Sequence, residues 1–238
     1  MRRIVWFSCG AASAVAAKLA INQYGHDAVD VVYCDTMKGE HPDNQRFFND
    51  VALWLGKGII KISSSVFETI EDVFEKRQYM AGPYGAPCTT YMKKHPRFHF
   101  QRADDIHIFG YTADEVKRVK EFVMNNPELD LDWILVRNGW TKEQCFGALK
   151  YAGVPLPVMY SLGYNNNNCL GCVKATSPKY WNMVRKDFPA VFDNRARQSR
   201  QLGARLVRLK GKRIFLDELS PDAMNENKEN LSCGPECK

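Results

Sequence analysis

Ile4-Val5-Trp6-Phe7-Ser8-Cys9-Gly10-Ala11-Ala12-Ser13 is a short apolar run followed directly by small residues. The four apolar residues are typical of a buried strand. An alanine-rich segment with apolar residues at helical spacing continues from Ala11 to Tyr24, where Gly25 ends it. The N-terminus therefore predicts a strand, a tight loop and a helix, in that order.

The same alternation continues along the chain. Further strands are predicted at 29–33, 59–62, 106–109 and 133–136, and helices at 113–125, 141–152 and from Pro42 onward. Residues 67–100 are expected to be less regular, with a loop at 81–87. This order predicts an α/β fold whose parallel five-stranded sheet carries helices on both faces, followed by a helical and irregular C-terminal part.

The expected organisation is a nucleotide-binding α/β domain at 1–157, a helical extension at 158–220 and a flexible tail at 221–238. The chain has 238 residues, of which 45% are hydrophobic and 25% charged, which suits a globular protein with a sizeable core. There is no membrane-spanning run and no signal peptide, so a reducing, cytoplasmic setting is expected. Eight cysteines in such a setting favour metal, cluster or redox chemistry over structural disulfides.

The formal net charge of +6 suits an anionic partner such as a nucleotide, a phosphate ester or a nucleic acid. Basic residues are densest between Arg195 and Arg213. Because no aromatic residues for base stacking are interleaved there, a solvated helix face is favoured over a nucleic-acid surface. A thiol electron donor and a second copy of the chain are further candidate partners.

The loop from Ser8 to Ser13 has the composition of a phosphate site. Small residues let the backbone approach an anion, the N–H groups that open the next helix point toward it, and two hydroxyls add donors. Tight packing of the helix on the strand is the alternative explanation. The loop resembles the S-G-G-x-D-S pyrophosphate loop of the adenine nucleotide alpha-hydrolase (PP-loop) superfamily, with matches at Ser8, Gly10 and Ser13 and departures at Cys9 and Ala12.

The form without the acidic residue is similar to the branch that contains phosphoadenylyl-sulfate (PAPS) and adenylyl-sulfate reductases. Further matches follow in the family's order and span residues 4 to 172: Cys34-Asp35-Thr36 with Glu40, Pro42 and Asp43; Cys88 with Lys93 and Pro96; Gly110 with Glu115 and Arg118; and Pro155, Tyr160, Gly163-Tyr164 and Cys169-x-x-Cys172. The resemblance implies PAPS, adenylyl sulfate or ATP as the bound adenine nucleotide. Its implied contacts are Ser8, Cys9, Gly10, Ala11, Ala12, Ser13, Asp35, Thr36, Gly110 and Glu115.

Several of these residues also have ordinary structural explanations. Asp35 can cap a turn, and Glu115 with Thr112 makes a capping box. Arg118 can reach a phosphate or can pair with Glu115, one helical turn away. Lys93 can hold an anion or lower the pKa of the Cys88 thiol.

Cys169-Leu170-Gly171-Cys172 is the sharpest local motif, because two thiolates at this spacing can bind one metal or cluster. A redox dithiol or two buried thiols are the alternatives. Cys88 falls where cluster-bearing reductases carry a tandem pair of cysteines, so the resemblance implies a [4Fe–4S] cluster on Cys88, Cys169 and Cys172. Cys237 from the tail is a candidate fourth ligand, and zinc is the alternative metal.

The tail residues Cys233-Gly234 resemble the C-G pair that carries the nucleophilic cysteine of the reductases, although Ser232 replaces the family's Glu and no His follows. The resemblance implies that Cys233 attacks sulfur, with Lys93 and Arg118 as the basic groups that steady the substrate. The expected activity is therefore reduction of a sulfonucleotide to sulfite. An ATP-dependent sulfurtransferase acting on a nucleobase or nucleic acid is one alternative, and a non-catalytic nucleotide-binding protein with a structural metal is another.

Overall fold

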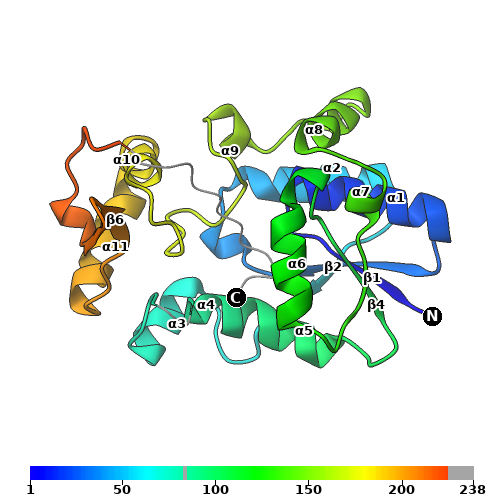
Figure 1. The fold of residues 1–238 in the computed structure, drawn as a ribbon, viewed down its shortest axis with the longest axis horizontal. Helices are drawn as coiled ribbons and strands as arrows, with labels where there is room; N and C mark the ends of the chain where they lie inside the picture. The colour runs from blue at the N-terminus through cyan, green and yellow to red at the C-terminus, as the bar shows by residue number, and fades with distance from the viewer. Residues whose placement is uncertain (83–84, 225–238) are drawn as a thin grey trace.

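The centre of the computed structural model, which describes residues 1–82 and 85–224, is a five-stranded parallel sheet (Figure 1). The strands are β1 (Arg3–Trp6), β2 (Val29–Cys34), β3 (Ile60–Ile62), β4 (Ile106–Phe109) and β5 (Asp130–Asp132), in the spatial order β3-β2-β1-β4-β5. The strand order reverses at β1, because the chain adds β2 and β3 on one side and β4 and β5 on the other. In such a sheet the crevice beyond the carboxyl ends of β1 and β4 is the expected ligand site.

Helices cover both faces of the sheet, as the sequence predicted. Successive side chains of a strand point to opposite faces. Val5 and Phe7 therefore belong to a core with α1 (Ala11–Tyr24), α2 (Asp43–Leu55) and α8 (Lys142–Tyr151). Ile4 and Trp6 belong to a second core with Phe122 of α6 (Val116–Asn125) and Phe100 of α5 (His95–Phe100). None of the described helices is long and apolar enough to cross a membrane.

The predicted strand at 133–136 is wrong. The edge strand lies just before it, where Leu131 of β5 stands opposite His107 of β4, and Ile134–Arg137 form the short helix α7. A four-residue apolar run suits a buried strand or a buried helical turn equally well, and its periodicity does not separate them. Here Ile134 and Leu135 pack into the core beneath α1, and the main-chain N–H of Arg137 bonds to the carbonyl of Trp133.

Residues 67–100 contain more helix than predicted. They form α3 (Ile70–Arg77), α4 (Pro87–Thr89), a π-helical turn (Thr90–Lys94) and α5. A capping box between Thr69 and Asp72 starts α3. The capping boxes at Thr112 with Glu115 and at Thr141 with Gln144 are present as predicted.

The C-terminal part forms α9 (Val158–Ser161), α10 (Pro178–Asp187), α11 (Pro189–Gln201) and a hairpin of β6 (Val207–Leu209) and β7 (Lys212–Ile214). Short 3-10 turns lie at Met37–Gly39, Ala113–Glu115 and Leu216–Glu218. Trp181 is fully buried in a third core, which also takes in Ile70 and Phe74 of α3. The division of the chain at residue 157 stays a prediction.

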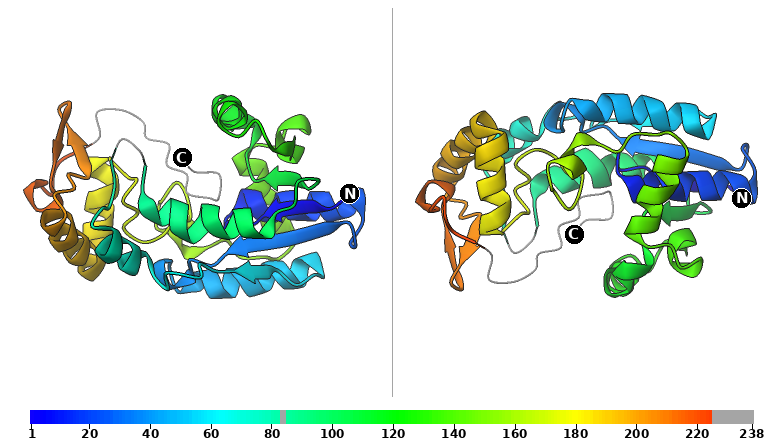
Figure 2. Two further views of the ribbon diagram at one scale, coloured as in Figure 1. Left: turned by 90° about the horizontal axis from the view of Figure 1, so that it is seen from below. Right: turned by 90° about the horizontal axis from the view of Figure 1, so that it is seen from above.

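The solvated helix face expected at 195–213 is only partly present. Arg195 lies on α11 but is 4% exposed, and the basic residues from Arg208 to Arg213 lie on the β6–β7 hairpin. Both views of Figure 2 place this hairpin at the end of the molecule opposite the N-terminus. Gly203, at a φ of +65°, follows the end of α11 and turns the chain away from the helix direction.

Candidate functional site

Hydrogen bonds made by its two serines hold the two ends of the Ser8–Ser13 loop together. The Ser13 hydroxyl donates to the Gly10 carbonyl over 2.9 Å and accepts from the Ser8 N–H over 3.1 Å. The Ser8 hydroxyl donates to Ser13 Oγ over 3.2 Å. Ser13 therefore shapes the loop. The N–H groups at the start of α1 are the donors suited to an anion, and that of Ala11 faces the Tyr160 hydroxyl.

Gly110 lies directly against the start of α1, where β4 ends. A Cβ at Gly110 would stand 2.6 Å from the main-chain nitrogen of Ser13 and 2.7 Å from its Cα. Real Cβ atoms do not come that close to backbone, so only glycine fits here. The end of β4 and the loop after β1 therefore meet at the point where the strand order reverses.

Cys9 has a φ of +56°, in the left-handed region that costs a side-chain-bearing residue about 1–2 kcal/mol. The family pattern that this loop resembles has glycine there. The Cys9 side chain is fully buried, its Sγ donates to the Asn44 carbonyl over 3.5 Å, and burial raises the pKa of its thiol well above the usual value. Its structural role is packing, because a buried thiol of raised pKa is a poor nucleophile.

A buried chain of hydrogen bonds supports this strained loop. Asn167 Nδ2 donates to the Cys9 carbonyl over 2.7 Å and to Asn44 Oδ1 over 2.8 Å. Asn44 Nδ2 donates to Glu40 Oε2 over 2.6 Å, and Thr36 Oγ1 donates to Glu40 Oε1 over 2.6 Å. The network thus joins the loop after β1, the end of β2 and the segment that leads into the C-x-x-C motif. The sequence analysis assigned no role to Asn167 or Asn44, because the partners are distant in sequence.

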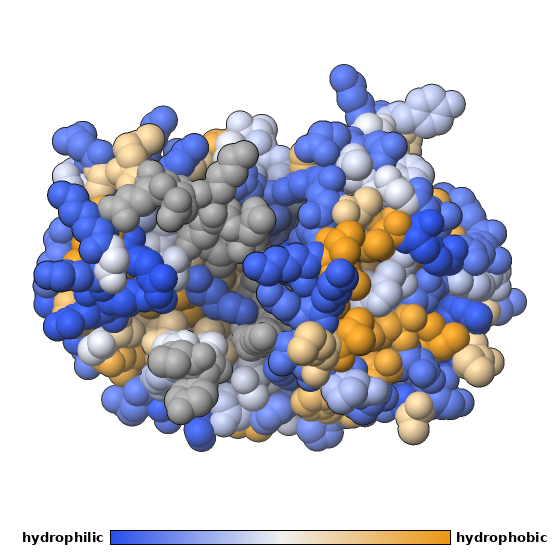
Figure 3. All heavy atoms as spheres, viewed as in Figure 1, coloured by the Kyte–Doolittle hydropathy of each residue, from blue (hydrophilic) through white to orange (hydrophobic). Residues whose placement is uncertain are grey.

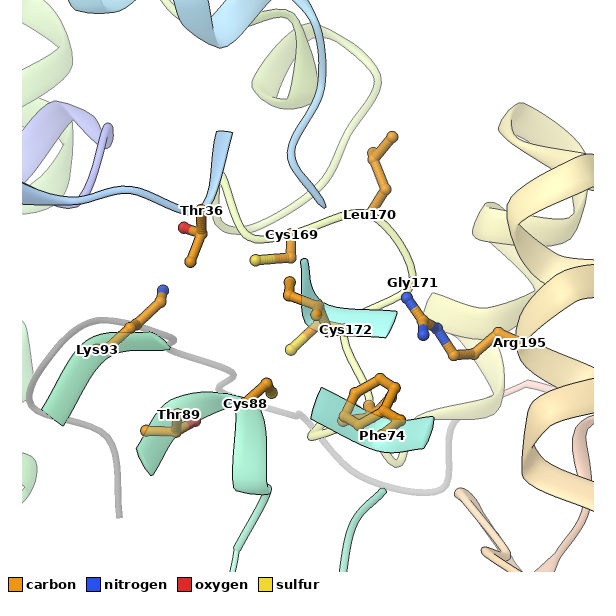
Figure 4. A pocket seen from close by; sticks show the side chains of 12 residues that line it. Thr36, Phe74, Cys88, Thr89, Lys93, Cys169, Leu170, Gly171, Cys172 and Arg195 are labelled. Carbon is orange, nitrogen blue, oxygen red and sulfur yellow. The ribbon is translucent and has the colours of Figure 1, made fainter. Parts of the chain in front are cut away.

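Cys88, Cys169 and Cys172 line one pocket, although α4 supplies the first and the loop between α9 and α10 supplies the other two (Figure 4). The hollow between these side chains is narrow and partly open to solvent. Figure 4 shows the Cys169 thiol directed toward Thr36 and the Cys172 thiol toward Cys88. The main-chain N–H of Leu170 bonds to the Gly39 carbonyl over 2.9 Å, which ties the motif to the chain just beyond β2.

Two buried cationic side chains line the same pocket. Lys93, from the π-helical turn after Cys88, is 7% exposed. Arg195 donates to Gln198 Oε1 over 2.8 Å and to Glu71 Oε1 over 3.0 Å. Its Nε is buried without a hydrogen-bond partner among the described residues and extends toward Gly171 (Figure 4). A pocket with two cations and three thiols suits an anionic, sulfur-bearing group.

The described residues contain no group of three or more His, Cys, Asp or Glu side chains placed to hold a metal ion. The thiols share one pocket, but over the described ranges they do not fit a cluster or zinc. Cys237, the expected fourth ligand, and Cys233, the expected nucleophile, lie outside the described residues.

Asp35, Glu115 and Arg118 adopt the structural roles that the sequence left open as alternatives. Asp35 Oδ1 accepts from the Met37 N–H over 3.0 Å. Glu115 accepts from the Thr112 N–H over 3.1 Å and pairs with Arg118, whose guanidinium lies 4.7 Å from the ring centre of Tyr111. Their contacts with a nucleotide stay predictions.

The order of the parallel strands, which reverses at β1, defines a doubly wound α/β protein. A structure of this class that the chain resembles is the crystal structure of phosphoadenylyl-sulfate (PAPS) reductase from Candida auris in a phosphate complex. The TM-score is 0.53 at 13% sequence identity, over 71% of this chain and 81% of that chain. No protein-family model and no curated protein sequence matches the chain. The fold expected from the resemblance is therefore confirmed.

Proposed function

We propose that the protein is an enzyme of the PAPS reductase-like family that binds an adenine sulfonucleotide and reduces its sulfo group to sulfite. The observation that carries this proposal is the pocket in which Cys88, Cys169 and Cys172 lie beside Lys93 and Arg195. The likeness of the fold to a PAPS reductase supports it. So does the buried network that ties this pocket to the loop after β1.

In the proposed complex the loop and the pocket take different parts of one substrate. Main-chain N–H groups at the start of α1, at Ala11 and Ala12, hold a phosphate with the help of the helix dipole. Adenosine lies beyond β2, near Asp35 and Thr36. The sulfo group points toward Lys93, whose buried charge stabilises the negative charge that develops on the leaving phosphate.

The proposed chemistry has two thiol steps. The thiolate of Cys233 attacks the sulfur, an S–S bond forms, and the bond from sulfur to the phosphate oxygen breaks, releasing AMP or adenosine 3′,5′-bisphosphate. A second thiol then attacks the Cys233 sulfur, a disulfide forms, and sulfite leaves with the electron pair. A thiol donor reduces that disulfide, so two thiols supply the two electrons.

Sulfite release is the direct test. Anaerobic protein is incubated with PAPS or adenylyl sulfate and a dithiol, and sulfite and released nucleotide are measured together. Cys233→Ser should abolish sulfite release, and the matched control Cys145→Ala, on the buried face of α8, should retain it. Equal turnover by both variants would remove Cys233 from the mechanism.

The expected cluster or zinc has its own test, because no step above depends on it. Anaerobic purification followed by iron, sulfide and zinc analysis distinguishes them, with about four irons per chain for a [4Fe–4S] cluster. Protein without stoichiometric iron or zinc would refute the metal expectation and leave the thiol mechanism standing.

An ATP-dependent sulfurtransferase acting on a nucleobase or nucleic acid is the second candidate. The basic C-terminal part favours it, and Ala12 at the acidic position of the family's loop disfavours it. Consumption of ATP that requires a nucleic-acid acceptor, without sulfite release from PAPS, would select this function. Tight binding of a nucleotide that stays intact would select a non-catalytic role.

A further inference from the structure

The net positive charge of the protein comes from its C-terminal part. Residues 158–224 contain twelve Lys and Arg against five Asp and Glu, whereas residues 1–157 contain nineteen of each. Two of the five acids, Asp217 and Glu218, are both paired with Arg200. Residues 158–224 therefore carry the net positive charge of the described residues, and the atoms at the left edge of Figure 3 that are not grey are mostly hydrophilic.

Four of these twelve basic residues lie on the β6–β7 hairpin and its turn. Arg208, Lys210, Lys212 and Arg213 are all exposed. The pairing register sets Arg208 directly opposite Arg213, and like charges at directly opposed positions destabilise a sheet. Arg213 also has a structural role, because its Nη1 donates to the Leu206 carbonyl over 2.8 Å, but its placement opposite Arg208 is unfavourable for the charges.

The tip of the hairpin has a second such feature. Lys210 and Gly211 have φ values of +48° and +74°, the signature of a type I′ turn, in which Asn or Gly is preferred at the first position. Lysine there is strained and exposed. Both unfavourable features place a positive charge where an anionic ligand can reach it.

The hairpin is joined to the cysteine pocket. The main-chain N–H of Arg208 donates to the Thr176 carbonyl over 2.8 Å, four residues beyond Cys172. Helix α11 connects the two regions as well, because Arg195 lines the pocket while Arg197 is exposed on the same helix. The cationic surface is thus built on the outer wall of the pocket.

We propose that the β6–β7 hairpin, with the exposed arginines of α11 and Arg205, binds the phosphate backbone of a nucleic acid. A projecting two-stranded ribbon with a charged tip matches the dimensions of a nucleic-acid groove. The ring centre of Phe215 lies 4.0 Å from the guanidinium carbon of Arg200 and 5.2 Å from that of Arg205. The ring is therefore occupied and does not stack a base, so binding is independent of sequence.

An anionic membrane is the less suitable partner. Leu209 and Ile214 of the hairpin are half-buried, and Ile214 packs against the third core. A surface helix or ribbon that binds membranes presents apolar side chains for insertion beside its basic residues. The hairpin presents charge without such anchors.

The test is binding of fluorescein-labelled, mixed-sequence DNA duplex, single-stranded DNA and single-stranded RNA, followed by fluorescence anisotropy between about 50 and 200 mM salt. Unmodified full-length protein should bind at least one probe, with affinity that falls steeply as salt rises. The triple variant Arg208→Gln, Lys210→Gln, Lys212→Gln should weaken binding by roughly tenfold or more and flatten the salt dependence.

A matched triple variant controls for net charge. Lys117→Gln, Lys120→Gln and Lys150→Gln remove the same charge from exposed positions on α6 and α8 and should change affinity by less than about twofold. The variant Lys210→Gly tests the effect of the charge apart from any effect on folding. Glycine removes the backbone strain at this turn position, so the melting temperature should hold or rise while the affinity for nucleic acid falls.

Three outcomes would overturn the proposal: no binding of any nucleic-acid probe at low salt, equal loss in the two triple variants, or binding of phosphatidylserine vesicles in place of nucleic acid. The assay needs no turnover. Loss of nucleic-acid binding with sulfite release intact, or the reverse, therefore distinguishes failure of this proposal from failure of the proposed reductase function.

Discussion

Asn167 and Cys9 are 158 positions apart in sequence, yet the Asn167 side-chain amide donates a 2.7 Å hydrogen bond to the Cys9 carbonyl. Cys9 is in the left-handed region, so its carbonyl faces away from the direction that an ordinary loop would give it. The bond holds the strained residue in place, and the second N–H of the same amide reaches Asn44. The segment before the C-x-x-C motif therefore determines the shape of the loop after β1.

Asn167→Ala should weaken both stability and nucleotide binding. It removes two buried hydrogen bonds, so the free energy of unfolding should fall by about 1–3 kcal/mol and the loop should lose its shape. Urea denaturation and calorimetric titration with PAPS or adenosine 3′,5′-bisphosphate measure the two effects. Asn165→Ala is the control, because the Asn165 side chain is exposed and the bond from Lys142 goes to the main-chain carbonyl of Asn165, which the substitution keeps. Unchanged nucleotide affinity in Asn167→Ala would separate the network from the site.

Gly110→Ala should have a larger effect on nucleotide binding, which it should abolish, than on the stability of the fold. The new methyl group would meet the Ser13 backbone, which cannot move without displacing the start of α1, so overpacking of about 1–3 kcal/mol is expected. Gly147→Ala in α8 is the matched control, because a Cβ there meets nothing within 4 Å. That substitution should stabilise the helix by up to about 1 kcal/mol. Thermal melts with and without nucleotide measure both, and equal nucleotide-induced shifts would contradict the prediction.

Stability should fall as pH drops from about 6.5 to about 4 because of His107. Burial lowers the pKa of His107 to about 4, and its Nδ1 accepts a 3.0 Å hydrogen bond from the Trp6 indole N–H, which only the neutral ring can do. In this window the unfolded chain takes up a proton that the folded chain does not, so the loss is up to about 2 kcal/mol after solvent screening.

The variant His107→Gln keeps an acceptor for Trp6 without titrating, so its unfolding free energy should depend less on pH over that window. Urea unfolding at several pH values provides the measurement. The matched substitution His26→Gln, at an exposed histidine, supplies the control. Identical slopes for the two variants would show that His107 does not contribute.

Cys9 and Cys145 should resist alkylation in the folded protein. Both are fully buried, and burial raises the pKa of the Cys9 thiol well above its usual value and that of Cys145 to about 12. At pH 8 the thiolate fraction of each is therefore small and iodoacetamide cannot reach it. Peptide mass spectrometry before and after urea unfolding locates the label. Modification of either cysteine without unfolding would contradict the burial argument.

Local patterns predicted the parts of the fold that depend on neighbouring residues. Four of the five strands, the helix that follows the Ser8–Ser13 loop and the capping boxes at Thr112 and Thr141 could be predicted, because periodicity and capping act within a few residues. The fifth strand could not be predicted, because a short apolar run beside β4 becomes strand or helix according to what it packs against. The three cysteines of the pocket could be grouped only through the family resemblance, in which their motifs follow one another in the same order.

The sequence by itself indicated the alternating order of strands and helices, the small-residue loop after β1 and the three cysteines that line the pocket. The way in which these parts meet depends on the folded structure: Asn167 bonds to the Cys9 carbonyl, Gly110 lies against Ser13, and Arg195 lines the cysteine pocket instead of a solvated helix face. The reason is physical. A hydrogen bond or a close contact between distant segments depends on the positions of both partners, and no local pattern carries those positions.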